Sequence, residues 1–332
     1  MKFFITMPVG PVRDTFFTPK TLARLAELGE VNSNPYDRNL TAEEVVEMAS
    51  DVDVLLTGWG TIRYNKELLK QFPNLKLIAH TAGSVAPVAD LDVYETDVAV
   101  ISGNNVFAKS VAEGALAYIL TALRRIEHYG NVVRTGGWKT AVFHNRGLIG
   151  KKVGVVGFGT ISKFFLELIR WFGCEVLIYS SHLDAETAAA YGGRTASLEE
   201  IFTECEVISL HTSLTEKTAG MITRELMEKL QPNALLVNTS RGGVIDEKAL
   251  FEFLMEGRFY AALDVYVEEP LLPDNPIRQC KNALLMPHMG GPTIDMREEV
   301  MMELCRDIDR LQKGQPLQNQ FNAASAARMT KG

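Results

Sequence analysis

Short apolar runs alternate with helical patterns along the whole chain. The runs carry little regular polar alternation, which is typical of strands that are buried on both faces of a parallel sheet. They are residues 3–9, 51–59, 74–82, 98–103, 151–159, 175–180, 206–212, 234–240, 261–265 and 283–287. This alternation predicts an α/β fold of open parallel sheets that helices cover on both faces.

Helix signals stand between the apolar runs. Thr18 precedes Pro19, a common pair for an N-cap and a first helical position, and Thr41 with Glu44 matches a capping box. We expect further helices at 65–72, 110–131, 160–172 and 293–312, and a loosely ordered small, polar tail after the last one. Because the strand pattern restarts after residue 131, and because 332 residues fit about two domains, the sequence predicts two α/β units.

Composition and charge narrow the functional classes. The chain is 46% hydrophobic and carries a formal net charge of −7 without any Lys/Arg run, which argues against nucleic-acid binding. The longest apolar stretches, such as 115–123, are shorter than a bilayer-spanning helix, so we expect no membrane segment. The N-terminus resembles a first strand more than a signal peptide.

The four cysteines are far apart and form no CxxC pair. This spacing argues against a zinc site and against a disulfide framework, and it suits a reducing compartment. The sequence therefore predicts a cytoplasmic protein without a metal site.

The strongest local motif is a glycine turn between a strand and a helix, Gly157-x-Gly159-x-x-Ser162. The first glycine permits a tight turn, the second lets the backbone approach a pyrophosphate, and the helix N-terminus offers free N–H groups. The alternative is a tight strand–helix turn that binds no ligand. We expect a dinucleotide here, bound by Gly157, Phe158, Gly159, Thr160 and Ile161.

The next strand ends at Ser180, where dinucleotide-binding folds usually have an acidic residue that binds the ribose 2′-hydroxyl. Ser180 carries no charge that would repel a 2′-phosphate, and Ser181 and His182 could donate hydrogen bonds to one. The cofactor is therefore expected to be NAD or NADP, and we hypothesise that NADP is accepted.

Seven segments resemble the D-isomer-specific 2-hydroxyacid dehydrogenase family, which includes glyoxylate and hydroxypyruvate reductases and phosphoglycerate dehydrogenases. They are LIAHTAG (77–83), SVAEGALAYIL (110–120), VGVVGFGTIS (153–162), LHTSLTEKTAGMI (210–222), LVNTSRGGVIDEKAL (236–250), ALDVYVEEP (262–270) and MPHMGGPT (286–293). The resemblance implies two Rossmann-like, doubly wound parallel-sheet domains, the cofactor domain being inserted into a discontinuous substrate domain. We expect the NAD(P)-binding domain at 104–292, the substrate domain at 1–103 plus 293–332, and the active site in the cleft between them.

Three residues match the catalytic set of the family: Arg241, Glu269 and His288. Hydride addition to a 2-oxo acid builds negative charge on the carbonyl oxygen, and a protonated imidazole can supply the proton, so His288 is the expected acid and base. Arg241 would bind the substrate carboxylate and carbonyl, and Glu269 would favour the imidazolium form of His288. Taken alone, each of these three residues could instead have a structural or surface role and no part in catalysis.

Further roles follow from the resemblance alone. Ser84 and Val85 align with a loop that binds the substrate carboxylate, although Ala86 and Pro87 depart from the usual pattern. Asp264 aligns with the carboxylate that binds the nicotinamide amide. The other residues expected at the cofactor are His211, Thr212, Asn238, Thr239, Ser240, His288 and Gly290.

The resemblance also implies partners. The segment 104–131 and the loop around Trp138 resemble the dimer-forming region of the family, so a homodimer is expected. The expected ligand is a small 2-oxo or 2-hydroxy acid, with no nucleic acid and no membrane. Two alternatives on the same fold stay open: a cofactor-sensing, corepressor-like binding protein, and an enzyme that oxidises formate or acts on another substrate. The three catalytic groups argue against a Rossmann methyltransferase, which does not need them.

Overall fold

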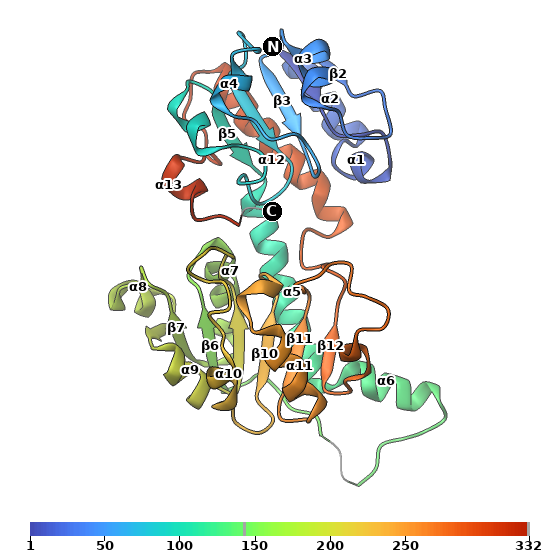
Figure 1. Ribbon diagram of the computed structural model, residues 1–332, viewed down its shortest axis with the longest axis vertical. Coiled ribbons are helices and arrows are strands. Elements are labelled where there is room, and N and C mark those ends of the chain that lie inside the picture. Colours follow the sequence, from blue (N-terminus) through green and yellow to red (C-terminus); the bar gives the residue numbers. More distant parts are fainter. Residues whose placement is uncertain (142–143, 331–332) are drawn as a thin grey trace. The chain divides into compact units, whose positions relative to one another are not determined.

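The computed structural model describes residues 1–141 and 144–330 (Figure 1). The strands are β1 Lys2–Ile5, β2 Glu30–Ser33, β3 Val54–Thr57, β4 Leu77–His80, β5 Ala99–Ser102, β6 Lys152–Val156, β7 Glu175–Tyr179, β8 Gly193–Thr195, β9 Val207–Leu210, β10 Leu235–Asn238, β11 Tyr260–Leu263 and β12 Ala283–Leu285. The α-helices are α1 Pro11–Phe16, α2 Pro19–Leu28, α3 Ala42–Ala49, α4 Lys66–Leu69, α5 Asn104–Arg124, α6 Ile126–Arg134, α7 Thr160–Ile169, α8 Ala185–Ala190, α9 Leu198–Glu204, α10 Arg224–Glu228, α11 Glu247–Met255, α12 Ile294–Gln312 and α13 Ala323–Ala326. Short 3-10 helices are η1 Leu91–Glu95, η2 Arg170–Phe172, η3 Gly242–Val244 and η4 Pro276–Gln279.

The chain divides into two compact units. Unit 1 comprises Met1–Ala108 and Pro292–Gly332, and unit 2 comprises Lys109–Gly291. The sequence analysis expected these boundaries near residues 104 and 292. Residues 331–332, which close the expected range 293–332, lie outside the described residues.

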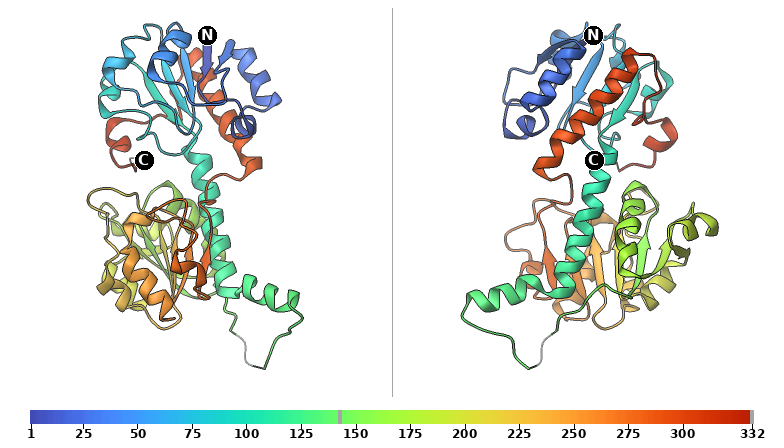
Figure 2. Two further views of the ribbon diagram at one scale, coloured as in Figure 1. Left: turned by 45° about the vertical axis from the view of Figure 1, so that its right-hand side comes forward. Right: turned by 180° about the vertical axis from the view of Figure 1, so that it is seen from behind.

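Unit 1 is built on a five-stranded parallel sheet in the order β2-β1-β3-β4-β5. Helix α12 lies across one face of this sheet (Figure 2), where Leu304 and Ile308 pack in one core with Phe3 and Ile5 of β1. A second core on the other face includes Phe4. The sequence analysis missed β2, because its residues Glu-Val-Asn-Ser form an edge strand with little apolar surface.

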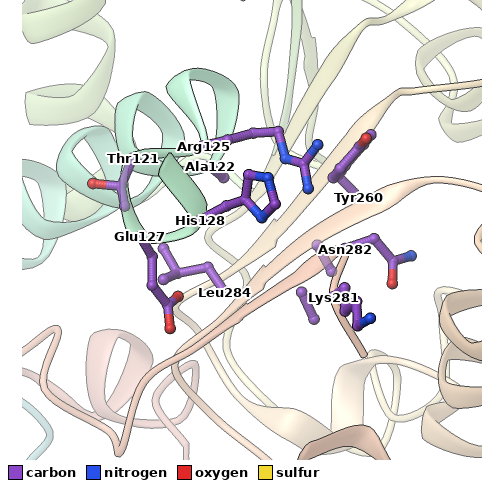
Figure 3. Close-up of a pocket in the computed structure, with 11 residues that line it drawn as sticks. Thr121, Ala122, Arg125, Glu127, His128, Tyr260, Lys281, Asn282 and Leu284 are labelled. Atoms are coloured by element: carbon purple, nitrogen blue, oxygen red, sulfur yellow. The ribbon is translucent and has the colours of Figure 1, made fainter. Parts of the chain in front are cut away.

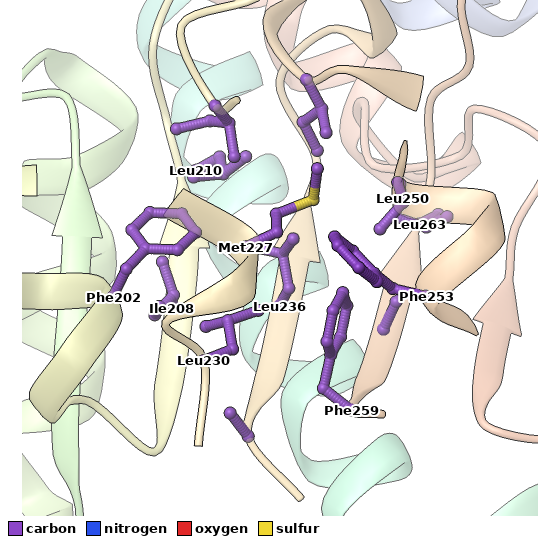
Figure 4. Close-up of a cluster of buried hydrophobic side chains, with 14 of the residues drawn as sticks. Phe202, Ile208, Leu210, Met227, Leu230, Leu236, Leu250, Phe253, Phe259 and Leu263 are labelled. Carbon is purple, nitrogen blue, oxygen red and sulfur yellow. The ribbon is translucent and has the colours of Figure 1, made fainter. Parts of the chain in front are cut away.

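Unit 2 is built on a seven-stranded parallel sheet in the order β12-β11-β10-β9-β6-β7-β8. Ala112 of α5 and Phe165 of α7 pack on one face. On the other face, Phe202 of α9, Met227 of α10 and Phe253 of α11 form a continuous apolar core (Figure 4). Both units therefore have the doubly wound parallel-sheet architecture that the sequence predicts.

The single helix expected at 110–131 is in fact two helices. Helix α5 begins earlier, at Asn104, and it ends where Arg125 takes a left-handed φ of 52° before α6 starts. By length and composition α5 is long and apolar enough to cross a membrane. The expectation that every apolar stretch is too short to do so was therefore wrong. Half of its most apolar window is buried, and Ala112 and Ile119 pack into the core of unit 2. The apolar stretch thus serves as a core helix.

The expectation of a loosely ordered tail after α12 is also wrong within the described residues. The buried carboxylate of Asp307 accepts hydrogen bonds from the backbone N–H groups of Gln318 and Asn319 at 2.8 and 2.9 Å. The Phe321 N–H donates to the carbonyl oxygen of Val100 in β5 at 2.9 Å. These long-range contacts order the segment, and no local sequence pattern predicts them.

Truncating Phe202 should destabilise unit 2, because its side chain is completely buried in the core of Figure 4. We expect Phe202→Ala to lower the free energy of unfolding by about 3–5 kcal/mol, the usual loss for a buried phenylalanine. The control is Trp171→Ala, since Trp171 is 94% exposed and its loss should change the free energy by less than about 0.5 kcal/mol. Denaturant unfolding followed by circular dichroism measures both, and equal effects would contradict the assigned core.

Candidate active site

Residues expected to bind the cofactor gather at one edge of the unit 2 sheet, where its parallel strands end. Strand order reverses between β6 and β9, which is the place where open α/β sheets bind ligands. The residues that end or follow the strands at this edge are Gly157 after β6, Ser180 after β7, His211 and Thr212 after β9, Asn238, Thr239 and Ser240 at β10, Asp264 after β11, and His288 and Gly290 after β12. This edge is the candidate site.

The glycine turn has the geometry that its sequence predicts. Gly157 has a φ of 102°, and a Cβ added there would lie 2.7 Å from the carbonyl oxygen of His211. Only glycine therefore allows the turn to pass this close to the end of β9. At Gly159 an added Cβ would meet no atom within 4 Å, so this face of the backbone is open to a ligand.

Ser162 caps the turn, a role that the sequence analysis missed. Its fully buried hydroxyl accepts a hydrogen bond from the Gly159 N–H at 2.7 Å and donates to the Gly159 carbonyl oxygen at 3.0 Å. Thr160 and Ile161 form the first turn of α7, at the positive end of its dipole. The ring of Phe158 packs edge-on against Tyr191, with the centroids 5.3 Å apart. The motif thus ends in a serine that is hydrogen-bonded to the turn, where such motifs often have a third glycine.

The end of β7 presents neutral polar groups. Ser180 is partly buried, and its hydroxyl lies 3.5 Å from the N–H of His182. Ser181 and His182 are exposed. The nearest carboxylate along the chain, Asp184, accepts the N–H and the hydroxyl of Thr187 at the start of α8. The position expected to contact the ribose therefore carries no charge of its own.

Two further residues expected at the cofactor, His211 and Thr239, have buried polar side chains. The Nε2 atom of His211 lies 2.9 Å from the Ser209 hydroxyl, and burial lowers the pKa of His211 to about 3, so this imidazole is neutral at physiological pH. The hydroxyl of Thr239 is buried and has no hydrogen-bond partner in the part of the chain that the structure describes. A polar ligand group at this edge would satisfy it, which fits a dinucleotide bound here.

Arg241 follows β10 on a loop that Asn238 holds. The Asn238 amide donates to the Arg241 carbonyl oxygen at 2.9 Å and accepts the N–H and the hydroxyl of Ser240 at 3.0 and 2.8 Å. Burial lowers the pKa of Arg241, an effect that the charge of Glu269 opposes, and a guanidinium remains charged in proteins. The site therefore contains a fixed, partly desolvated cation.

A close backbone contact brings the Arg241 loop against the loop that carries Glu269. A Cβ added at Gly242 would lie 2.0 Å from the carbonyl carbon of Tyr266, so no other residue fits without moving the chain. The Tyr266 N–H in turn donates to Oε1 of Glu269 at 2.9 Å. The glycine after Arg241 thus allows two loops from different strands to meet.

Glu269 and His288 are in direct contact. Oε2 of Glu269 lies 2.6 Å from Nδ1 of His288, and the side chains are 33% and 48% exposed. Because Nδ1 is engaged by the carboxylate, Nε2 is the nitrogen that remains for exchanging a proton with a ligand. The structure thus brings together the Glu269 and His288 side chains, and the charge of Glu269 acts on Arg241.

Asp264 holds the turn on which His288 sits. Its carbonyl oxygen accepts the His288 N–H at 2.9 Å, and its carboxylate accepts the N–H groups of Met289 and Gly290, each at 2.7 Å. His288 has a φ of 55°, a conformation rare outside glycine, so these bonds stabilise a strained backbone. The carboxylate expected to bind the nicotinamide amide therefore already has a structural role.

The expected substrate residues Ser84 and Val85 belong to unit 1 and follow β4. The Ser84 hydroxyl donates to the carbonyl oxygen of Thr330 at 3.0 Å, and the Val85 N–H points to the sulfur of Met329 at 3.4 Å. A thioether is a weak acceptor, which a carboxylate would replace readily. The C-terminal segment therefore covers this loop, a contact that the sequence analysis missed.

A cavity lies elsewhere in unit 2, beside the first residues of β11 and β12 (Figure 3). Its lining includes Arg125, His128, Tyr260 and Lys281, and none of the expected site residues. Because Asp264 and His288 follow the other ends of the same strands, this cavity is separate from the candidate site. Within residues 1–141 and 144–330, no group of three or more His, Cys, Asp or Glu side chains could hold a metal ion.

Comparison with known proteins connects this site to a family. Residues 116–290, more than half of the chain, match the model of the D-isomer specific 2-hydroxyacid dehydrogenase NAD binding domain. The chain is 33% identical to a glyoxylate reductase of Thermococcus litoralis, over 84% of this chain and 86% of that protein. It is 31% identical to a hydroxypyruvate reductase of Thermotoga maritima, over 81% of this chain and 88% of that protein.

Longer relatives match as well. The chain is 32% identical to a D-3-phosphoglycerate dehydrogenase of Methanocaldococcus jannaschii over 90% of its own length, but it spans only 56% of that protein.

Solved structures share the fold. The TT0316 protein from Thermus thermophilus superposes with a TM-score of 0.77 and 27% identity, over 96% of this chain and 99% of that one. A phosphoglycerate oxidoreductase from Rhizobium etli gives a TM-score of 0.81 at 22% identity, over 97% of this chain and 98% of that one. The family match over residues 116–290 and the 33% identity to the glyoxylate reductase show that the chain belongs to the D-isomer specific 2-hydroxyacid dehydrogenase family.

Proposed function

We propose that the protein is an oxidoreductase that transfers hydride between NAD(P)H and a small 2-oxo or 2-hydroxy acid with D-isomer specificity. The observation that carries the proposal is the 2.6 Å contact between Glu269 and His288. The loop that carries Glu269 packs against the loop that carries Arg241. An acid–base imidazole beside a fixed cation suits a reaction in which charge develops on a carbonyl oxygen.

The proton step follows from the two nitrogens of His288. With Nδ1 donating to Glu269, the imidazolium form carries its second proton on Nε2, where it can pass to the carbonyl oxygen of a 2-oxo acid. In the oxidative direction the same nitrogen takes the proton from the 2-hydroxyl group. Arg241 binds the substrate carboxylate and carbonyl oxygen with its guanidinium fork. We assign Ser84 and Val85 of unit 1 to substrate binding as well, on their alignment alone.

The nicotinamide cofactor, when bound, accepts or supplies the hydride at C2 of the acid. The residues proposed to hold it are the glycine turn with Thr160 and Ile161, then Ser180, His211, Thr212, Asn238, Thr239, Ser240, Asp264, His288 and Gly290. The open face at Gly159 and the unpartnered buried hydroxyl of Thr239 among the described residues support this assignment.

We further propose that NADP is accepted. An acidic residue at the position of Ser180 would repel a 2′-phosphate, whereas Ser180 is neutral and the exposed Ser181 and His182 can donate hydrogen bonds.

A homodimer formed through α6 and the loop around Trp138 is the proposed assembly. Helix α6 has no fully buried residue, and Ile126, Val133 and Trp138 are 56%, 55% and 72% exposed. Exposed large apolar side chains such as these are typical of an interface with another protein. A cytoplasmic location without nucleic-acid or membrane partners completes the proposal.

Replacing His288 tests the reaction directly. We expect His288→Ala to lower kcat for reduction of glyoxylate or hydroxypyruvate by about 10²–10⁴-fold, because the general acid is lost, and to change the cofactor Kd far less, because the other residues proposed to hold the cofactor remain. Steady-state kinetics with NADH and NADPH measure kcat, and fluorescence titration measures the Kd of the cofactor. The control is His128→Ala, an exposed histidine outside the site.

A His288→Ala variant with near-normal kcat would refute the assignment. Wild-type protein that binds the cofactor but reduces no acid in a broad panel would instead favour the corepressor-like alternative.

An acidic residue at position 180 should change cofactor choice. We expect Ser180→Asp to lower kcat/KM for NADPH by at least about tenfold, since a carboxylate would repel the 2′-phosphate while accepting a hydrogen bond from the 2′-hydroxyl of NADH. Ser180→Ala serves as the matched control, because it removes the same hydroxyl without adding a charge. If wild-type protein already prefers NADH strongly and Ser180→Asp changes nothing, the proposal for NADP is wrong.

A further inference from the structure

Three consecutive residues, from His288 to Gly290, are anchored on one buried residue. The carboxylate of Asp264 is 1% exposed, and its two oxygens accept the N–H groups of Met289 and Gly290, while its backbone carbonyl accepts the N–H of His288. A Cβ added at Gly290 would lie 2.7 Å from Oδ2 of Asp264, so this close approach needs glycine. The left-handed conformation of His288 therefore depends on this carboxylate.

The third donor to the carboxylate is a side chain from another element. The hydroxyl of Tyr118, on α5, donates to Oδ1 of Asp264 at 3.3 Å, and Tyr118 is partly buried. Burial, together with the negative charge of Asp264, raises the pKa of Tyr118, so the phenol keeps its proton over the working pH range. It therefore acts as a permanent donor.

The anchor works only while Asp264 is ionised, because a protonated carboxyl presents an O–H where an N–H group must donate. Burial raises the pKa of Asp264, and the Met289 and Gly290 N–H groups, the charge of His288 and the Tyr118 hydroxyl lower it. The other titratable groups facing it are Tyr266, whose pKa the carboxylate raises, and Glu269 through its contact with His288. Among these contributors, the Tyr118 hydroxyl is the one that a substitution can remove without touching the turn or the catalytic pair.

We propose that Tyr118 is a positioning residue, whose hydroxyl keeps the Asp264 carboxylate in place and thereby holds the turn that carries His288. The kinetic effect of this inference rests on the proposed function, whereas the hydrogen bonds among Tyr118, Asp264 and the turn do not depend on that function. Without the hydroxyl, Asp264 takes up a proton at a higher pH, the turn loosens as the pH falls, and His288 leaves its place beside Glu269. The loss is therefore small at alkaline pH and grows toward acid pH.

The test is Tyr118→Phe, which retains the ring and removes only the oxygen. We expect kcat to stay within about twofold of wild type at alkaline pH and to fall about tenfold below it at acid pH, roughly the smallest loss expected when a hydrogen bond to a charged group is removed. KM for the 2-oxo acid should change little. Tyr260→Phe is the matched control, because Tyr260 lies at the other end of β11, the strand that precedes Asp264.

A second readout does not require activity. In cofactor-free protein labelled with ¹³C at Cε1 of histidine, the His288 signal, assigned with His288→Gln, reports its environment across the same pH range. Tyr118→Phe should broaden or split this signal at acid pH, and Tyr260→Phe should not. If the protein reduced no acid, the proposed function would fail while this signal still tested Tyr118.

Tyr118→Leu separates the hydroxyl from the ring. If Tyr118→Phe matches wild type in both readouts at every pH while Tyr118→Leu alone is impaired, the ring merely packs and the inference is overturned. A pH-dependent defect shared by Tyr118→Phe and Tyr118→Leu supports it.

Discussion

The contact between the Glu269 carboxylate and the His288 imidazole is the interaction on which the account depends. It engages one ring nitrogen at 2.6 Å and leaves the other for a ligand. The contact exists because two loops, after β11 and after β12, leave the same edge of a parallel sheet. A parallel sheet places all strand ends of one sense on one side, so residues far apart in the sequence can meet there.

Several unusual backbone features support that contact. Gly242 allows the Arg241 loop to pack against the backbone of Tyr266, and Gly290 allows the chain after His288 to reach the Asp264 carboxylate. Asn238 and Asp264, both almost fully buried, use their side chains to bind backbone groups of the loops. These side chains were expected to face the cofactor, and the structure adds a role for each in shaping the loops that carry the proposed catalytic residues.

The sequence predicted the parts that repeat simple physical patterns. Apolar runs located the central strands, and the glycine motif located the tight turn between a strand and a helix. The sequence analysis did not predict the edge strands β2 and β8, because edge strands bury little apolar surface. Three other features were not predicted, for another reason: the helix break at Arg125, the ordered segment at Gln318 and Asn319, and the Tyr118–Asp264 hydrogen bond. They depend on contacts between distant residues or on a left-handed residue that is not glycine, and neither has a local pattern.

The most direct test is a crystal structure with oxidised cofactor and oxamate, an unreactive mimic of a 2-oxo acid. The account predicts that the oxamate carbonyl oxygen lies about 3 Å from Nε2 of His288 and that the guanidinium of Arg241 binds the same ligand. Oxamate bound away from both groups, for example in the cavity beside Arg125 and Lys281, would contradict it.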